Sequence, residues 1–89
     1  MKHAGPTALD SIEPMLAALR ALPGLNERKR GTFYRGSKAF IHFHEDPAGM
    51  FADVRLIDDF ERFRVTTKRE QDACVRRVRK TLGARSPRT

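Results

Sequence analysis

The chain is poor in the features that mark membrane, secreted and disulfide-stabilised proteins. A single cysteine among 89 residues excludes an internal disulfide and a zinc site built from several cysteines. No apolar run approaches the ~20 residues that a membrane-spanning helix needs, and residues 1–11 lack the apolar stretch of a secretory signal. We therefore expect a cytoplasmic protein without a membrane partner.

The sequence also lacks the motifs of the common catalytic classes. It has no glycine-rich phosphate-binding loop, and no nucleophile stands beside a recognisable base. Ser37 falls in a predicted turn, and Cys74 lies on the apolar side of a predicted helix, which is typical of a buried, unreactive thiol. These absences favour a non-enzymatic protein that has no cofactor.

The composition is that of a small globular domain. Hydrophobic residues make up 39% of the chain and charged residues 33%, which favours a folded protein over a disordered one. The length predicts a single domain over residues 1–89, and the sequence shows neither an internal repeat nor a linker. We expect an ordered core over about residues 10–83 and a mobile basic tail over residues 84–89.

Positive charge is concentrated in two blocks within a chain whose formal net charge is +7. Residues 28–38 contain five bases and no acid, and residues 68–89 contain eight bases and two acids. Such blocks favour a polyanionic partner, above all nucleic acid, although they are also typical of a merely soluble surface. The residues predicted to bind the polyanion are Arg28, Lys29, Arg30, Arg35, Lys38, Arg62, Arg64, Arg76, Arg77 and Lys80.

Two helices are predicted from apolar spacing and capping residues. The first begins at Asp10 or Ser11 and ends before Pro23-Gly24, because apolar residues recur at helical intervals between these points. The second begins with Thr67 and Glu70, which match the S/T-x-x-E capping box. Its apolar stripe consists of Cys74, Val75, Val78 and Leu82, and Gly83 is expected to end it.

Between the helices, alternating residues and turn signals predict four strands, at residues 30–35, 38–45, 50–57 and 60–65. Gly36-Ser37 is typical of a two-residue type II′ hairpin. Asp46-Pro47-Ala48-Gly49 predicts a second turn. The resulting fold class is α+β, in the order α-β-β-β-β-α, with a four-stranded antiparallel meander and both helices packed on one face.

The alternation of side chains selects the register of the central hairpin. Pairing Ile41 with Val54 gives one apolar face, whereas a slip of one residue would mix apolar and polar residues on both faces. This register also pairs His42 with Asp53. Continuing it to the last strand predicts that Phe63 pairs with Val54 and Val65 with Ala52.

The other face of the predicted sheet combines aromatic rings with histidines. Its predicted contact residues are Phe33, Phe40, His42, His44, Phe51 and Phe60. Arginines interspersed with these rings favour a platform for single-stranded nucleic acid. A homodimer that presses two such faces together is the alternative, and a third interpretation is additional core covered by another part of the chain.

His42 and His44 project to the same side of one strand, and Asp53 is predicted across from His42. Two histidines and one carboxylate can bind iron or zinc, so a metal-dependent enzyme centred on His42 and His44 is a further hypothesis. We expect no metal, because histidines in an H-x-H pattern on a strand are commonly hydrogen-bonded surface residues. The expected role of Asp53 is to hold His42.

Three segments resemble a known group of proteins. LRALPG, KAFIHFHEDPAGMFADVRL and FERFRVTT, in this order before a terminal helix, resemble a family of small uncharacterised bacterial proteins loosely labelled luciferase-like. The layout is also similar to that of MmcQ/YjbR-like domains, for which DNA binding has been suggested. The first resemblance covers about residues 15–82. It implies no catalytic residue and no light emission, since the sequence carries no flavin-phosphate or oxygen-activating signature.

Overall fold

The structure combines helices with an open antiparallel sheet, which confirms the α+β class. In this computed structural model residues 1–84 are described, so residues 85–89 of the predicted tail lie outside the described part. The helices are α1 (Pro6–Asp10), α2 (Glu13–Arg20) and α3 (Lys68–Ala84). The strands are β1 (Lys2–His3), β2 (Asn26–Lys29), β3 (Thr32–Arg35), β4 (Lys38–Asp46), β5 (Gly49–Arg55) and β6 (Phe60–Arg64).

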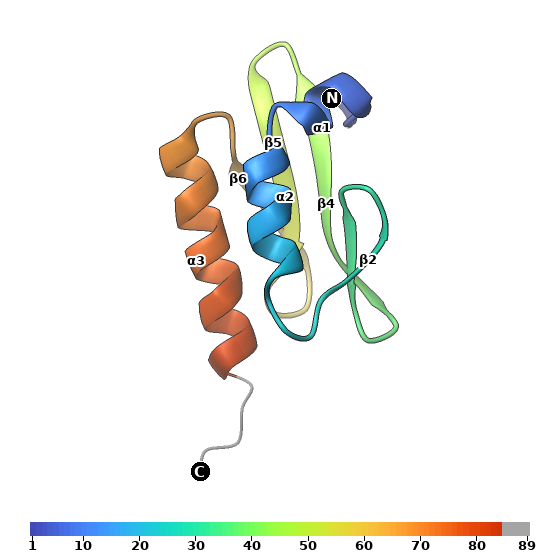
Figure 1. Cartoon of the computed structure of the whole chain (residues 1–89), viewed down its shortest axis with the longest axis vertical. Coiled ribbons are helices and arrows are strands. Elements are labelled where there is room, and N and C mark those ends of the chain that lie inside the picture. The colour runs from blue at the N-terminus through green and yellow to red at the C-terminus, as the bar shows by residue number, and fades with distance from the viewer. Residues whose placement is uncertain (85–89) are drawn as a thin grey trace.

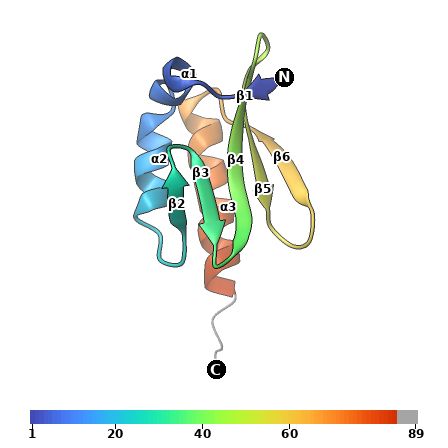
Figure 2. The ribbon, with the colours of Figure 1, turned by 90° about the vertical axis from the view of Figure 1, so that its right-hand side faces the viewer.

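The strands follow one another across the sheet in the order β2-β3-β4-β5-β6 (Figure 2), and β1 pairs with β4 outside this path. β5 pairs with residues 41–46 of β4, so β1 must lie on the opposite edge of β4. That edge is shared, because β3 pairs with residues 38–41 and β1 with residues 44–45. The sheet therefore contains two more strands than the predicted meander.

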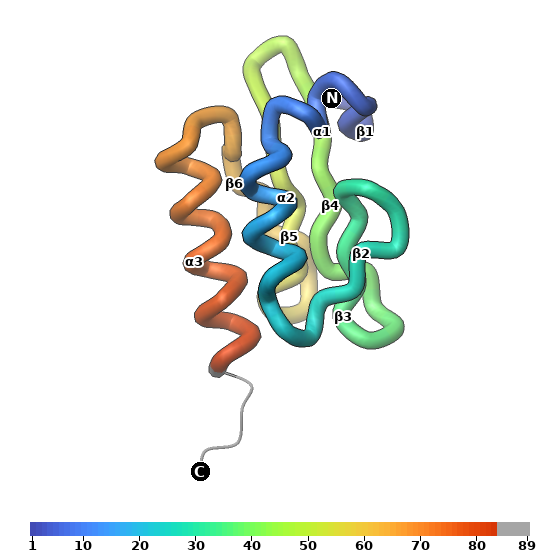
Figure 3. Tube along the Cα trace, viewed as in Figure 1, coloured from blue at the N-terminus to red at the C-terminus, as the bar shows by residue number. Residues whose placement is uncertain are grey.

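The N-terminal segment is ordered, contrary to the prediction of a loose tail and a single first helix. β1 lies beside β4 and α1 follows it (Figure 3). The segment forms two helices, and Pro6 and Pro14 each occupy the first turn of one, where a missing amide removes no intrahelical hydrogen bond. The Ser11 hydroxyl donates to the Ala8 carbonyl at 2.6 Å, which closes α1 and does not cap α2.

β2 occupies a segment that the sequence did not identify as a strand. It pairs with β3 through a tight turn at Arg30-Gly31, and Lys29 stands opposite Thr32. Gly31 has a φ of 84°, in the left-handed region that glycine adopts without strain. The predicted strand at residues 30–35 therefore begins at Thr32, after this turn.

A β-bulge in β4 changes which face Phe33 occupies. Arg35 pairs with Lys38 around Gly36-Ser37. Gly36 has a φ of 63°, and Ser37 has a negative φ because only glycines have a positive φ among the described residues. These two values agree with the predicted two-residue type II′ hairpin. The next pairs are Tyr34–Ala39 and Phe33–Ile41, which leave Phe40 without a partner. Phe33 therefore shares the core face with Ile41. Both Phe33 and Phe40 are buried, which corrects their predicted place on the exposed aromatic face.

The central hairpin has the predicted register. Ile41 pairs with Val54 and His42 with Asp53. The outer hairpin differs from the prediction by two residues, because four residues separate Arg55 from Phe60 and Phe63 pairs with Ala52. A shift of two residues preserves the alternation of faces, so Phe63 still lies on the side of Ala52 and Val54.

α2 and α3 lie side by side (Figure 1) and contribute to one hydrophobic core. The capping box that begins α3 is confirmed, since the Glu70 amide donates to Thr67 Oγ1 at 3.1 Å and the Thr67 amide donates to Glu70 Oε1 at 2.9 Å. α3 continues through Gly83 to Ala84 and so does not end at Gly83.

Burial raises the pKa of Cys74 to about 12, as expected for an unreactive thiol. Within residues 1–84, no helix combines the length and apolar character required to cross a bilayer.

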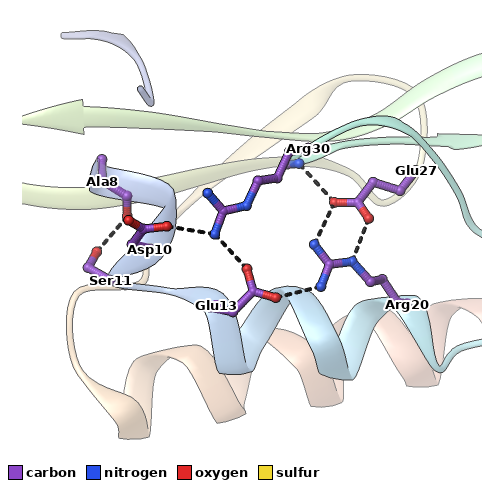
Figure 4. Close-up of polar contacts among 8 residues, drawn as sticks. Ala8, Asp10, Ser11, Glu13, Arg20, Glu27 and Arg30 are labelled. Carbon is purple, nitrogen blue, oxygen red and sulfur yellow. Dashed lines mark hydrogen bonds and ion pairs between the residues drawn. The ribbon is translucent and has the colours of Figure 1, made fainter. Parts of the chain in front are cut away.

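A chain of charged side chains joins the N-terminal helices to the turn between β2 and β3 (Figure 4). Glu13 accepts hydrogen bonds from Arg30 at 2.7 Å and from Arg20 at 2.6 Å, and Arg20 also donates to Glu27 at 2.5 Å. Glu27 in turn accepts a hydrogen bond from the Gly31 amide at 2.9 Å. Arg30, a predicted polyanion contact, is thus part of an internal network.

The bulge leads to a stability prediction for two phenylalanines. Phe33→Ala should destabilise the domain by about 3–5 kcal/mol, because it empties a fully buried site. Phe60→Ala is the matched control and should cost less than half as much, since Phe60 is 37% exposed. Urea unfolding followed by circular dichroism measures both. Phe33→Leu replaces the alanine variant if that variant does not fold. Equal losses at Phe33 and Phe60 would contradict the assigned bulge.

Candidate metal centre

Three histidines meet on one face of the sheet. His42 and His44 are two positions apart in β4 and therefore project to the same side. The antiparallel pairing of β1 with β4 places His3 directly opposite His44. One ring nitrogen from each histidine lies within 4.8 Å of the others. We call the surface formed by His3, His42, His44, Asp53 and their neighbours in β5 and β6 the histidine face.

The rings are packed against one another. The His3 and His44 rings are stacked, with centroids 4.8 Å apart and an interplanar angle of 28°. The His42 ring meets the His44 ring edge-on, and His42 Nδ1 lies 3.1 Å from His44 Nε2. His3 is exposed, whereas His42 and His44 are half-buried. The cluster is thus accessible from solvent on the side of His3.

Asp53 contacts the histidine pair differently from the prediction. Its backbone stands opposite His42, as predicted, but its Oδ2 atom lies 3.2 Å from His44 Nε2. Asp53 therefore holds His44 as well as lying across from His42. Arg62, from the opposing position in β6, donates to both oxygens of Asp53 at 2.8 and 2.9 Å. This bidentate pair fixes the orientation of the carboxylate.

The electrostatics of the cluster favour a neutral imidazole beside an ionised carboxylate. The hydrogen bonds from Arg62 hold the pKa of Asp53 below its usual value. The pKa of His42 is also lowered, mainly because the ring is partly buried. The charge of Asp53 raises this pKa, whereas His44, His3 and Arg62 lower it further. A neutral imidazole has a free nitrogen lone pair, which is the form that binds metals.

The aromatic part of the histidine face is smaller than predicted. Phe60 packs edge-on against the His42 ring at a centroid distance of 4.8 Å, and the Arg55 guanidinium lies 4.5 Å from the Phe60 centroid. Phe51 stands opposite His44 and is half-buried. Because Phe33 and Phe40 belong to the core, Phe51 and Phe60 are the phenylalanines that remain for a partner. A homodimer through this face stays a prediction.

The predicted polyanion-binding residues do not gather in one place. Arg62 and Arg64 are in β6, where Arg62 pairs with Asp53 and Arg64 with Glu70 at 2.8 Å. Arg77 approaches Glu61 at 4.0 Å. Arg28 stacks on the Tyr34 ring at 3.9 Å. The remaining bases are divided between the β2–β4 hairpins and α3, namely Lys29, Arg30, Arg35, Lys38, Arg76 and Lys80.

His3 is the site residue that sequence reasoning missed. A strand of two residues carries no periodicity, and its burial pattern is exposed at both positions. The hydrogen bonds that fix this segment come from residues about forty positions away, such as the bond from the Gly5 amide to Glu45 Oε2 at 2.7 Å. No local signal could therefore have brought His3 to His44.

Comparison with known proteins leaves the site to be interpreted from its geometry. No protein-family model matches the chain, and neither does any curated protein or solved structure. The resemblances to luciferase-like and MmcQ/YjbR-like proteins therefore stay predictions.

The carboxylate at the centre of the histidine face leads to a prediction for β6. Arg62→Met should lower the urea midpoint more than Arg64→Met does, because Arg62 compensates the largely buried carboxylate of Asp53 and Arg64 the half-exposed carboxylate of Glu70. Methionine retains an unbranched stem at both positions, so the variants differ in the charge pair they remove. The loss in Arg62→Met should shrink at low pH, since the stability that Asp53 contributes is complete above its unfolded-state pKa and is lost as the pH falls through its lowered folded-state pKa. Equal midpoints for the two variants would contradict this role of Asp53.

Proposed function

We propose that this protein binds one divalent transition-metal ion of the zinc class through His3, His42 and His44. The observation that carries the proposal is the convergence of one ring nitrogen from each of these residues within 4.8 Å. Histidine is the commonest metal-ligating side chain. The third imidazole replaces Asp53 in the ligand set that the sequence suggested, and it is the reason for proposing a metal where none was expected.

The spacing of the nitrogens suits tetrahedral coordination. Zinc binds histidine nitrogen at about 2.0–2.1 Å, so two nitrogens in a tetrahedral site lie about 3.3 Å apart. His42 Nδ1 lies 3.1 Å from His44 Nε2, so the two rings of β4 already stand close enough for one ion to reach both. The separations that involve His3 need to shorten by no more than about 1.5 Å from the 4.8 Å limit. His3 is exposed, and its side chain can therefore rotate without disturbing the core.

Asp53 and Arg62 orient one of the proposed metal ligands, His44. A metal-ligating histidine commonly donates its other N–H to a carboxylate, which fixes the tautomer and makes the ligand more basic. Asp53 Oδ2 lies within 3.2 Å of His44 Nε2 and can accept such a bond. A proton on Nε2 leaves the lone pair on Nδ1 of His44. Arg62 keeps this carboxylate ionised.

The surroundings favour an open site over a closed structural one. We infer that α2 and α3 cover the face of the sheet that carries Ile41 and Val54, because these residues share one core with both helices. The histidines alternate with this core face along β4 and so lie on the opposite side. Within residues 1–84, three ligands on the face opposite the helices leave a fourth position for water or a small ligand, the arrangement of catalytic rather than structural zinc sites.

Metal titration tests the proposal. Untagged protein should bind about one equivalent of Zn²⁺ or Co²⁺ in isothermal titration calorimetry. His3→Ala, His42→Ala and His44→Ala should each abolish tight binding, because each removes a ligand. Asp53→Asn should weaken binding by about 10–100-fold, the range for a carboxylate that supports a ligating histidine. Metal should also raise the melting temperature, and a chelator should reverse the rise.

Lys2→Ala is the matched control for the metal titration. Lys2 precedes His3 in the same short strand and points away from the histidine face, so its removal should leave the affinity unchanged. Equal Zn²⁺ affinity in His3→Ala and Lys2→Ala would contradict the three-histidine site. Absence of stoichiometric binding by the unaltered protein would remove the proposal altogether.

A second candidate function, polyanion binding, is favoured by one feature of α3. Residues 73–84 contain no acid, and Arg76, Arg77, Arg79 and Lys80 are exposed along them. The bases on the β2–β4 hairpins are partly engaged in contacts within the chain, as described above for Arg28 and Arg30. We therefore place the polyanion-binding surface on α3 rather than on the hairpins.

Salt dependence tests this second function. Binding to labelled single- and double-stranded oligonucleotides should weaken steeply with salt, because bound counterions are released. Arg76→Gln with Arg79→Gln should reduce the slope of log affinity against log salt by roughly 1.4–1.8, at about 0.7–0.9 per lost phosphate contact. Arg28→Gln with Lys38→Gln, which removes the same charge from the hairpins, should change the slope less. No binding to either oligonucleotide at low salt would exclude the function.

A further inference from the structure

A cleft opens beside two of the three histidines. It has a volume of about 380 Å³, and its lining includes His3 and His42 together with Lys29, Thr32, Tyr34 and Phe43. We call it the β1–β3 cleft, because it lies where β1 and β3 share one edge of β4 without meeting. The gap between these strands is the structural reason for the cleft, and it brings solvent-accessible space to the metal site.

The size of the cleft restricts what it can hold. Sites for small molecules span about 300–1,000 Å³ and are lined mainly by apolar groups with a few polar ones. At about 380 Å³ the β1–β3 cleft lies near the lower limit. Its lining combines the apolar residues Leu9 and Phe43 with the hydroxyl-bearing residues Thr32 and Tyr34. A small organic molecule fits this description, whereas a polymer would contact the cleft only through one end.

The charge of the cleft selects an anion. Its lining contains Lys29 and Arg30 and no acid among the described residues. Arg30 is neutralised by Asp10 at 2.9 Å and Glu13 at 2.7 Å, but Lys29 is exposed and takes part in none of the ion pairs within residues 1–84. Arg28 adds positive charge nearby, since its guanidinium lies over the Tyr34 ring, 3.9 Å from the centroid. Histidine ligands add no negative charge to a bound metal, so a divalent ion held by them would attract an anion.

We propose that the β1–β3 cleft is the binding site for a small organic anion whose oxyanion group occupies the open position of the metal. The inference rests on the proposed metal site, because the metal supplies the contact to the oxyanion. The apolar body of the ligand lies against Tyr34, and Lys29 in the cleft lining acts as a second cation. A carboxylate and a phosphate monoester share this chemistry.

Cobalt-loaded protein provides the test. The visible absorption of bound Co²⁺ responds to a change of its ligands, so titration with benzoate should alter the spectrum with saturation. Benzoate should bind about ten-fold tighter than acetate, because its ring is withdrawn from water in the cleft. Benzyl alcohol, a neutral molecule of similar size, should leave the spectrum unchanged. Phenyl phosphate in place of benzoate tells which oxyanion the cleft prefers, and saturable binding of either supports the proposal.

Two lysine variants separate the cleft from general surface charge. Lys29→Gln should weaken benzoate binding about three- to five-fold, the effect of one exposed charge pair, and should leave the Co²⁺ affinity unchanged. Lys38→Gln is the matched control, since Lys38 is an exposed lysine of the next hairpin that does not line the cleft. It should change neither affinity.

The outcomes distinguish failure of the inference from failure of the metal site. Loss of Co²⁺ binding in the unaltered protein would overturn the proposed function itself. Normal Co²⁺ binding with a spectrum indifferent to benzoate and phenyl phosphate would overturn the anion site alone. Equal affinity for benzoate and acetate would also overturn it, because the metal would then bind the oxyanion without help from the cleft.

Discussion

The pairing of β4 with its neighbours is the constraint on which the rest of the structure depends. β5 occupies one edge of this strand, and β3 and β1 divide the other. Alternation along β4 sends Ile41 and Phe43 into the core and His42 and His44 to the opposite face. The core, the histidine cluster and the β1–β3 cleft are therefore all consequences of how this one strand is paired.

The bulge at Phe40 allows a short hairpin at Gly36-Ser37 and the burial of Phe33 to occur together, which a regular ladder of hydrogen bonds would not. The short hairpin at Gly36-Ser37 pairs Tyr34 with Ala39, and a regular continuation would have placed Phe33 opposite Phe40. One extra residue in β4 turns Phe33 toward the core instead. The domain thereby gains a fully buried aromatic ring, which matters for a chain of 89 residues whose core is small.

The histidine face shows how charge and burial combine to prepare a site. Asp53 is a buried acid whose carboxylate is compensated by Arg62 and directed at His44. A buried carboxylate without such a partner would be costly, and so the arginine allows an ionised group to stand beside the histidine rings. The same arrangement that satisfies Asp53 also orients His44, which links the stability of β5 and β6 to the chemistry proposed for β4.

Local patterns in the sequence determined the central hairpin, the capping box of α3 and the shared face of His42 and His44, because each depends on residues close together in the chain or on simple alternation. The tertiary structure alone decided the place of His3, the bulge at Phe40 and the partner of Asp53. His3 reaches His44 through hydrogen bonds between segments about forty residues apart. A bulge adds a residue that alternation cannot anticipate, and so the third ligand and the true aromatic surface emerge only when distant strands pair.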